Sequence, residues 1–263
     1  FASKIRRKLR VYDAHELFCE MEEIVSRPRI FKLWKAIERY AVPQFPHGYT
    51  IGDCYAQAFY EMYQVKYEVV RNATFLQAHQ KPLQTNNKYI LYQGAVNEGR
   101  SFETLIPAMK EVDCKLIICG EGNFFEQAKA LVIAHQLQDK IEFKGYVEPS
   151  QLRLYTQQAT IGITLFTNQG KSNFLSMANR FFDYMHAGVP QLCVAFPEYK
   201  KLNEQFEISY LIEDTHENTI SQALNNLLND HALFQHLQQQ CLKAREVYCW
   251  QQEEIKLISF FNA

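Results

Sequence analysis

The sequence lacks the features of several protein classes. It has no Asp-x-Asp motif, no Cys-x-x-Cys pair and no other spacing typical of metal ligands. No run approaches the roughly 18 apolar residues that a membrane-spanning helix needs. The formal net charge is -1 over 263 residues, so no overall positive charge favours nucleic acid. No 20–50-residue repeat is visible, which argues against a solenoid.

The cysteines and the N-terminal residues bear on location. The chain has 7 Cys, an odd number, and Cys119 and Cys193 lie in apolar runs, which favours reduced thiols in a cytoplasmic protein. The first residues show no signal-peptide pattern, and none is expected. A basic cluster near the start allows two interpretations, a solvated helix end or peripheral contact with anionic lipid at the inner membrane surface. It consists of Lys4, Arg6, Arg7, Lys8 and Arg10.

What is present describes a globular α/β protein. Hydrophobic residues make up 47% of the chain and charged residues 22%, and the length suits one large domain or two ordinary ones. From about residue 85, short apolar runs alternate with helical patterns, which predicts a complete doubly wound parallel sheet. The expected strands are 89–93, 115–119, 141–144, 160–165, 191–195 and 210–212; the expected helices are 101–112, 123–136, 149–158 and 198–205.

Glycines mark one edge of this sheet. Gly94, Gly120 and Gly145 directly follow three of the expected strands, at the carboxyl edge where such sheets bind ligands. Residues 1–72 show the same pattern with only about three strands, fewer than a stable doubly wound sheet usually has. The sequence therefore predicts two Rossmann-like α/β domains, the first incomplete, joined by a linker at 73–88 and followed by helices over 216–262.

The most informative segment is 173–190. It predicts one helix that ends at Gly188 and Pro190. One face is apolar, and the other carries a polar stripe that would be mostly buried. Buried polar groups need hydrogen-bond partners, so this stripe is expected to line a ligand pocket. The apolar face is formed by Phe174, Ala178, Phe181 and Met185, and the polar stripe by Ser176, Asn179 or Arg180, and Asp183.

Further segments carry distinctive motifs, namely Val11–Glu16, Val69–Asn72, Gly94–Ser101, Ile118–Gly122, Phe143–Val147 and Trp250–Phe261. Together with the helix at 173–190, they resemble in order and spacing the motifs of the GT-B glycosyltransferases, in particular the retaining enzymes of glycosyltransferase family 4. The resemblance implies that residues 1–75 are the C-terminal part of an acceptor-side domain truncated at its N-terminus. Residues 76–245 would form the donor-binding domain, and 246–263 a closing helix that packs back on the first domain.

The resemblance also implies a donor site. Arg100 would neutralise the diphosphate, helped by the N-terminus of the 173–185 helix. Asp183 would accept hydrogen bonds from the ribose hydroxyls, unless it pairs with Arg180 within the helix. Arg100 has an alternative as an exposed loop charge. The expected donor-binding residues are Gly94, Arg100, Gly120, Gly122, Lys144, Gly145, Asn179, Arg180 and Asp183.

Two departures affect this assignment. Leu175 stands where the family typically has the first of two Glu residues, and Ala95 stands where it has an Arg in the donor loop. We hypothesise that Arg180 replaces the missing cation. On the acceptor side, His15 and Asp13 are the expected catalytic residues, with His15 donating to a sugar hydroxyl or helping to deprotonate the acceptor. Their alternative is a structural role at a strand end.

The implied activity is transfer of a sugar from a nucleotide-activated donor to an acceptor hydroxyl, with retention, without metal and without a cofactor. The acceptor would be a glycan, a lipid-linked molecule or a small molecule, as in cell-envelope polysaccharide biosynthesis. Two alternatives stay open: a GT-B nucleotide-sugar epimerase, and a catalytically degenerate module that only binds a nucleotide sugar. Leu175 and Ala95 favour the latter.

Overall fold

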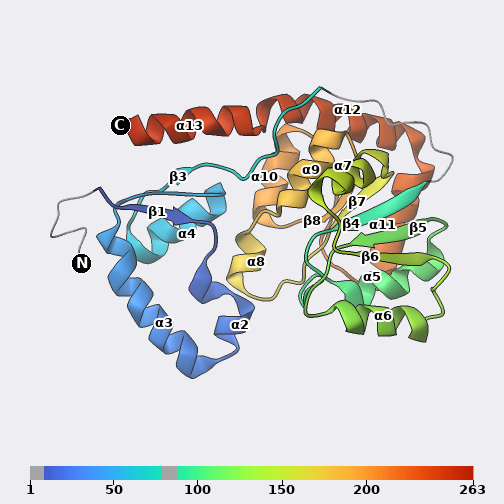
Figure 1. Cartoon of the computed structure of the whole chain (residues 1–263), viewed down its shortest axis with the longest axis horizontal. Coiled ribbons are helices and arrows are strands. Elements are labelled where there is room, and N and C mark those ends of the chain that lie inside the picture. Colours follow the sequence, from blue (N-terminus) through green and yellow to red (C-terminus); the bar gives the residue numbers. More distant parts are fainter. Residues whose placement is uncertain (1–8, 79–87, 263) are drawn as a thin grey trace. The chain divides into compact units, whose positions relative to one another are not determined.

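The computed structural model describes residues 9–78 and 88–262, which form two compact units (Figure 1). The first unit contains the described residues up to 72, together with 168–177 and the chain from 250 onward. The second contains the described residues of 73–167 and 178–249. Lys4, Arg6, Arg7 and Lys8 of the expected basic cluster, and most of the expected linker, lie outside the described residues.

The second unit contains a six-stranded sheet in the order β6-β5-β4-β7-β8-β9, with every neighbouring pair parallel. This confirms the predicted doubly wound sheet. From β4 the chain continues to β5 and β6 on one side of the sheet, and it later adds β7, β8 and β9 on the other side. Because the connections run in opposite directions from β4, a crevice is expected between the carboxyl ends of β4 and β7. The strands are β4 (Tyr89–Gln93), β5 (Lys115–Cys119), β6 (Ile141–Gly145), β7 (Ile161–Thr164), β8 (Gln191–Val194) and β9 (Ser209–Ile212).

Helices of this unit pack in two groups. One group contains α5 (Phe102–Ala108), η3 (Met109–Glu111), α6 (Phe125–Ala134) and α11 (Glu217–Asn229); the other contains α7 (Pro149–Gln158), α9 (Asn179–Ala187) and α12 (His231–Val247). α10 (Pro197–Gln205) joins β8 to β9. The last residues of β4 show that the groups lie on opposite faces. The ring of Tyr92 contacts Phe102 of α5, whereas Gln93 bonds to residues of α7 and α9.

The first unit is built on a three-stranded parallel sheet in the order β1-β2-β3. Its strands are β1 (Val11–Ala14), β2 (His47–Thr50) and β3 (Glu68–Val69). Its helices are η1 (Phe18–Glu20), α2 (Glu22–Val25), α3 (Pro28–Ala41), η2 (Val42–Gln44), α4 (Asp53–Tyr63), α8 (Lys171–Leu175) and α13 (Trp250–Asn262). Arg10, the described member of the basic cluster, lies over the ring of Phe45 at 5.3 Å.

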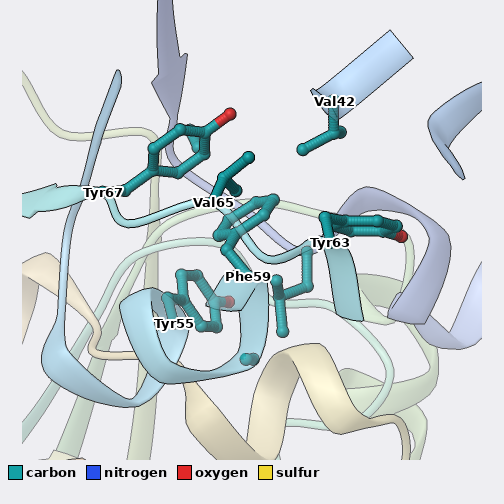
Figure 2. Packing of buried hydrophobic residues seen from close by; sticks show 9 residues of the cluster. Val42, Tyr55, Phe59, Tyr63, Val65 and Tyr67 are labelled. Atoms are coloured by element: carbon teal, nitrogen blue, oxygen red, sulfur yellow. The ribbon is translucent and has the colours of Figure 1, made fainter. Parts of the chain in front are cut away.

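Aromatic side chains fill the core of the first unit (Figure 2). Phe59 of α4 is fully buried, and its ring lies 5.1 Å from that of Tyr67 and 6.2 Å from that of Tyr63. α13 is tied to the same unit by a buried carboxylate. Glu253 accepts hydrogen bonds from the backbone N–H of Arg71 at 3.0 Å and from Lys256 at 2.8 Å.

The prediction of one helix over 173–185 is wrong. Two helices, α8 and α9, are separated by an extended stretch between Ser176 and Ala178. The hydroxyl of Tyr199 accepts a hydrogen bond from the backbone N–H of Ala178 at 3.0 Å, a donor that a continuous helix would use internally. The predicted end at Gly188 is confirmed. Ser176 consequently belongs to the first unit, apart from the rest of the stripe in the second.

Phe59 gives a test of the first unit's core. We expect Phe59→Ala to lower the free energy of unfolding by about 3–5 kcal/mol, because it removes the ring at the centre of the aromatic cluster and leaves a cavity. Tyr60→Ala is the matched control, since Tyr60 is the next residue of α4 and is exposed. Urea unfolding followed by near-ultraviolet circular dichroism measures both changes. Equal small effects in the two variants would contradict this account of the core.

Candidate functional site

Glycines bring three strand ends of the second unit into close contact. The backbone N–H of Gly94 donates to Cys119 at 3.0 Å, and that of Gly120 donates to Gly145 at 2.7 Å. Gly120 has a φ of +143°, and a Cβ there would lie 1.9 Å from the carbonyl oxygen of Gly94. Only glycine fits at this position. The expected donor-site glycines therefore form one continuous backbone surface at the carboxyl edge of the sheet.

The loop after β4 packs on a fourth glycine. A Cβ at Gly122 would lie 2.2 Å from the side-chain oxygen of Asn97 and 2.4 Å from the carbonyl oxygen of Val96. That side-chain oxygen also accepts a hydrogen bond from the backbone N–H of Asn123 at 3.0 Å. The loop that carries Arg100 is thus held against the loop after β5.

Two guanidinium groups meet at one aromatic ring. The guanidinium carbon of Arg100 lies 4.4 Å from the ring centre of Phe166, and that of Arg180 lies 4.8 Å from the same centre. Arg180 also lies over the ring of Tyr92, at 4.7 Å. Phe166 follows β7, Tyr92 belongs to β4, and Arg180 is in the first turn of α9. Two cations therefore converge at the crevice between β4 and β7, beside the loop that begins at Gly94.

Arg180 is buried without a balancing carboxylate. It donates to the hydroxyl of Tyr92 at 3.4 Å and to the carbonyl oxygen of Leu165 at 3.5 Å, both near the limit for a hydrogen bond. Among the described residues, its buried Nε has no acceptor and no acidic side chain forms an ion pair with it. One terminal nitrogen would lie 3.3 Å from a Cβ on Gly94. A buried guanidinium in this state has unused capacity to bind an anion.

Asp183 belongs to a separate network one turn further along α9. Its Oδ1 accepts from the hydroxyl of Thr74 at 2.7 Å, and its Oδ2 accepts from the Nε2 of Gln93 at 2.9 Å. The Oε1 of Gln93 accepts in turn from Thr156 at 2.7 Å. Within the described chain, Asp183 therefore pairs with these groups and not with Arg180. Two of about four acceptor positions on the carboxylate are used, so it can accept further hydrogen bonds.

A cavity of about 220 Å³ adjoins this carboxylate. Its lining combines apolar side chains with charged and amide groups from the chain at 74–78 and from α7, α9 and α12. Burial raises the pKa of Asp183, although the hydrogen bonds from Thr74 and Gln93 act in the opposite direction. The residues of the Asp183 network, namely Thr74, Gln93, Thr156 and Asp183, all line this cavity.

Other expected donor-site residues have different surroundings. Lys144 forms an ion pair with Glu142, whose hydrogen bond raises the pKa of the lysine. Asn179 is exposed at the first position of α9. Gly145 ends β6 with a φ of +64°. These residues lie at or near the strand ends, but the structure gives no contact that assigns Lys144 or Asn179 to a ligand.

The expected catalytic pair lies in the first unit. The Nε2 of His15 is 2.7 Å from a carboxylate oxygen of Asp13, and its Nδ1 is 3.2 Å from the side-chain nitrogen of Asn72. Both side chains of the pair are about half exposed. Burial and the negative charge of Asp13 raise the pKa of Tyr49 on the neighbouring strand. Asp13 and Asn72 hold the imidazole at two points, so its ring orientation is fixed while its face remains accessible.

Sequence reasoning missed the residues that position these groups. Phe166, Tyr92, Gln93, Thr74 and Thr156 were not expected at the site. Of these five, Gln93 could have been identified from the sequence, since it is a polar residue at the end of an otherwise apolar strand. Among the described residues, no group of three or more His, Cys, Asp or Glu side chains could hold a metal ion.

Asp183 gives a prediction about pH. Since its pKa is raised on folding, its contribution to stability is most favourable below the unfolded value of about 3.9 and decreases as the pH rises through the folded pKa. Thr74→Val removes a hydrogen bond that favours the ionised form, so the pKa of Asp183 should rise further. The ¹³C resonance of the Asp183 carboxyl, followed against pH, measures this value. Thr104→Val is the control, and a lower pKa in Thr74→Val would contradict the assignment.

Residues 75–245, well over half of the chain, match the family model described as glycosyl transferases group 1. No curated protein sequence matches the chain. None of the described helices combines the length and the hydropathy of a membrane-spanning segment.

Solved structures of low sequence identity share the fold. Sucrose-phosphate synthase from Thermosynechococcus elongatus has a TM-score of 0.79 at 15% identity, over 99% of this chain and 70% of that one. Anabaena HepE in complex with UDP has a TM-score of 0.78 at 14% identity, over 99% and 74%. S. aureus TarM in complex with fondaparinux, alpha-GlcNAc-glycerol and UDP has a TM-score of 0.70 at 14% identity, over 86% and 46%. This chain thus spans less than half of that TarM chain, and the matches show the fold alone.

Proposed function

Because the chain belongs to the family of group 1 glycosyl transferases, we propose that its second unit binds a sugar nucleotide and that the protein transfers the sugar to an acceptor hydroxyl. One observation carries the proposal. Arg100 and Arg180 converge on Phe166 beside Gly94, and Arg180 is a buried cation with unused hydrogen-bonding capacity. A diphosphate, with its negative charge and many acceptor oxygens, is the ligand chemistry that satisfies this arrangement.

The two arginines would act on the leaving group. When the bond between the anomeric carbon and the diphosphate oxygen breaks, negative charge grows on the diphosphate. Guanidinium groups already in place stabilise that charge without reorganising, because the ring of Phe166 holds both of them. The first turn of α9 adds the positive end of its dipole. In this proposal Arg180 supplies the charge that Ala95 does not.

The nucleoside would occupy the cavity beside Asp183. In the proposed complex the carboxylate accepts hydrogen bonds from the ribose hydroxyls at its two unused positions. The cavity of about 220 Å³ beside Asp183 provides the space for this group. HepE and TarM have been solved with UDP, and HepE also with UDP-glucose. We therefore propose a uridine diphosphate sugar as the donor.

The reaction would proceed with retention of anomeric configuration and without a divalent metal, as expected for retaining family 4 enzymes. His15, held by Asp13 and Asn72, would contact the sugar or the acceptor hydroxyl and assist its deprotonation. The acceptor would be a glycan, a lipid-linked molecule or a small molecule, used in cell-envelope polysaccharide biosynthesis. A cytoplasmic location, with peripheral contact at the inner membrane surface, belongs to the same proposal.

Leu175 favours a second candidate function. It lies in α8 and packs against the aromatic core of the first unit, so it offers no carboxylate to a ligand. A module that binds the nucleotide sugar without transferring it would tolerate leucine here. Donor turnover separates the two functions: release of sugar from UDP-sugar, to water or to an acceptor, supports the transferase, whereas UDP binding without any release supports the binding module.

Substitution of Arg180 tests the donor site most directly. We expect Arg180→Gln to weaken UDP binding about tenfold or more, because it removes charge-assisted hydrogen bonds to phosphate, and to leave uridine binding unchanged. Isothermal titration calorimetry measures both ligands. Lys129→Gln is the matched control, since Lys129 is also a cation over a phenylalanine ring, at 4.4 Å from Phe125, but on an exposed surface. Unchanged UDP affinity in Arg180→Gln, with the fold intact, would refute the assignment.

Metal independence gives a separate test. If arginines and a helix terminus neutralise the diphosphate, EDTA should leave the rate of sugar release from UDP-sugar unchanged, and added Mg²⁺ or Mn²⁺ should not raise it. The rate is measured from UDP formation, with the metals removed by dialysis before EDTA is added. A loss of activity in EDTA that Mg²⁺ restores would show that a metal performs the role assigned to Arg180.

A further inference from the structure

The helix α3 presents apolar side chains to the solvent. Leu33 is 61% exposed and Tyr40 63% exposed, and three more large apolar side chains of the helix are exposed as well. Phe18 and Val25, from η1 and the end of α2, are also exposed. The ring of Phe18 lies 5.3 Å from that of Trp34, so the two elements share one surface. We define the α3 face as Phe18, Val25, Ile30, Leu33, Trp34, Ile37 and Tyr40.

Polar contacts, by contrast, attach α3 to its own unit. The ammonium of Lys35 donates to Glu20 at 2.6 Å, to Glu38 at 3.0 Å and to the hydroxyl of Tyr63 at 2.8 Å. The hydroxyl of Tyr63 also bonds to Glu38. Burial alone would lower the pKa of Lys35, but these hydrogen bonds raise it above its ordinary value, so the ammonium stays charged. The helix is therefore fixed with its apolar side turned away from the core.

Cations flank the apolar side. At about 100° per residue, Arg29, Lys32 and Arg39 occupy the sector between the α3 face and the attached side. All three are exposed, and none has an ion pair among the described residues. The acidic residue of α3 is Glu38, which the Lys35 network already engages. An apolar stripe with Trp and Tyr, bordered by Arg and Lys, is the pattern of a helix that lies in a membrane interface.

We infer that the α3 face docks on a lipid surface that carries anionic headgroups. In this arrangement Leu33, Trp34 and Ile37 enter the boundary between headgroups and acyl chains, and the three cations reach the headgroup phosphates. The charge pattern favours lipid over a protein partner, because the cations lie along one border of the stripe, where they can reach headgroup phosphates while the stripe enters the apolar layer. Glu22 and Glu23 of α2 carry the opposite charge and limit the attraction. This role rests on the membrane contact of the proposed function, for which it names the surface, and it does not depend on donor binding.

Vesicle binding tests the inference on the full chain, without donor or acceptor. The protein is sedimented with vesicles of phosphatidylcholine alone and with vesicles that also contain phosphatidylglycerol. We expect binding to the anionic vesicles, and a decrease of at least tenfold in the partition coefficient for Leu33→Asp and Ile37→Asp. Ile133→Asp is the matched control, since Ile133 is 63% exposed on α6 of the other unit and should not affect binding.

The cations and Trp34 give two further measurements. Each of Lys32→Gln and Arg39→Gln should lower the partition coefficient for anionic vesicles about fivefold, the effect of one cation near such a surface. In a Trp250→Phe background, the emission of Trp34 should shift to shorter wavelength on binding and be quenched by brominated lipid.

Three results would overturn the inference: no vesicle binding, binding that Leu33→Asp and Ile133→Asp leave equally strong, or a concentration-dependent dimer that Leu33→Asp abolishes. The last would assign the α3 face to a second copy of the chain. Because donor titrations are run without vesicles, failure here removes the membrane contact and leaves the proposed transfer reaction untouched, and failure of UDP binding leaves this inference untouched.

Discussion

The position of β4 is the constraint on which the second unit depends. It lies between β5 and β7, where the connections leave the sheet in opposite directions, and its last two residues point to opposite faces. Tyr92 therefore faces α5 and supports Arg180, while Gln93 faces α7 and α9 and holds Asp183. One strand end thus positions a buried cation and a buried carboxylate that belong to the same helix.

These two buried charges are stabilised in different ways. Asp183 has hydrogen-bond donors on both oxygens, so its burial is partly compensated in the absence of a ligand, although its pKa stays raised. Arg180 relies on two aromatic rings and two long hydrogen bonds, and one of its nitrogens is unsatisfied within the described chain. Cation–π contacts give only a few kcal/mol at most, less than a full set of hydrogen bonds to an anion. The difference makes Arg180 the group that gains most when an anion binds.

Periodicity in the sequence was sufficient for the sheet and for the glycine-lined edge, because strand runs and the glycines after them are local signals. The break between α8 and α9 is not local. Neither Ser176 nor Ala178 is a strong helix breaker, and the break is stabilised by the hydroxyl of Tyr199, about twenty residues further along the chain. The same applies to Phe166: a phenylalanine after a strand reads as core, and its contact with two arginines depends on tertiary packing.

For a related reason, the helical period of the sequence does not predict which side of α3 faces the core. An amphipathic pattern predicts that the apolar side of a helix faces the core. In α3 the ammonium of Lys35 bonds to two carboxylates and a tyrosine hydroxyl, and satisfying that group requires the side that carries Lys35 and Glu38 to face inward. Turning the helix over would give up these hydrogen bonds, so the network opposes burial of the apolar stripe. The polar network therefore decides the orientation, and the exposed apolar stripe is its consequence.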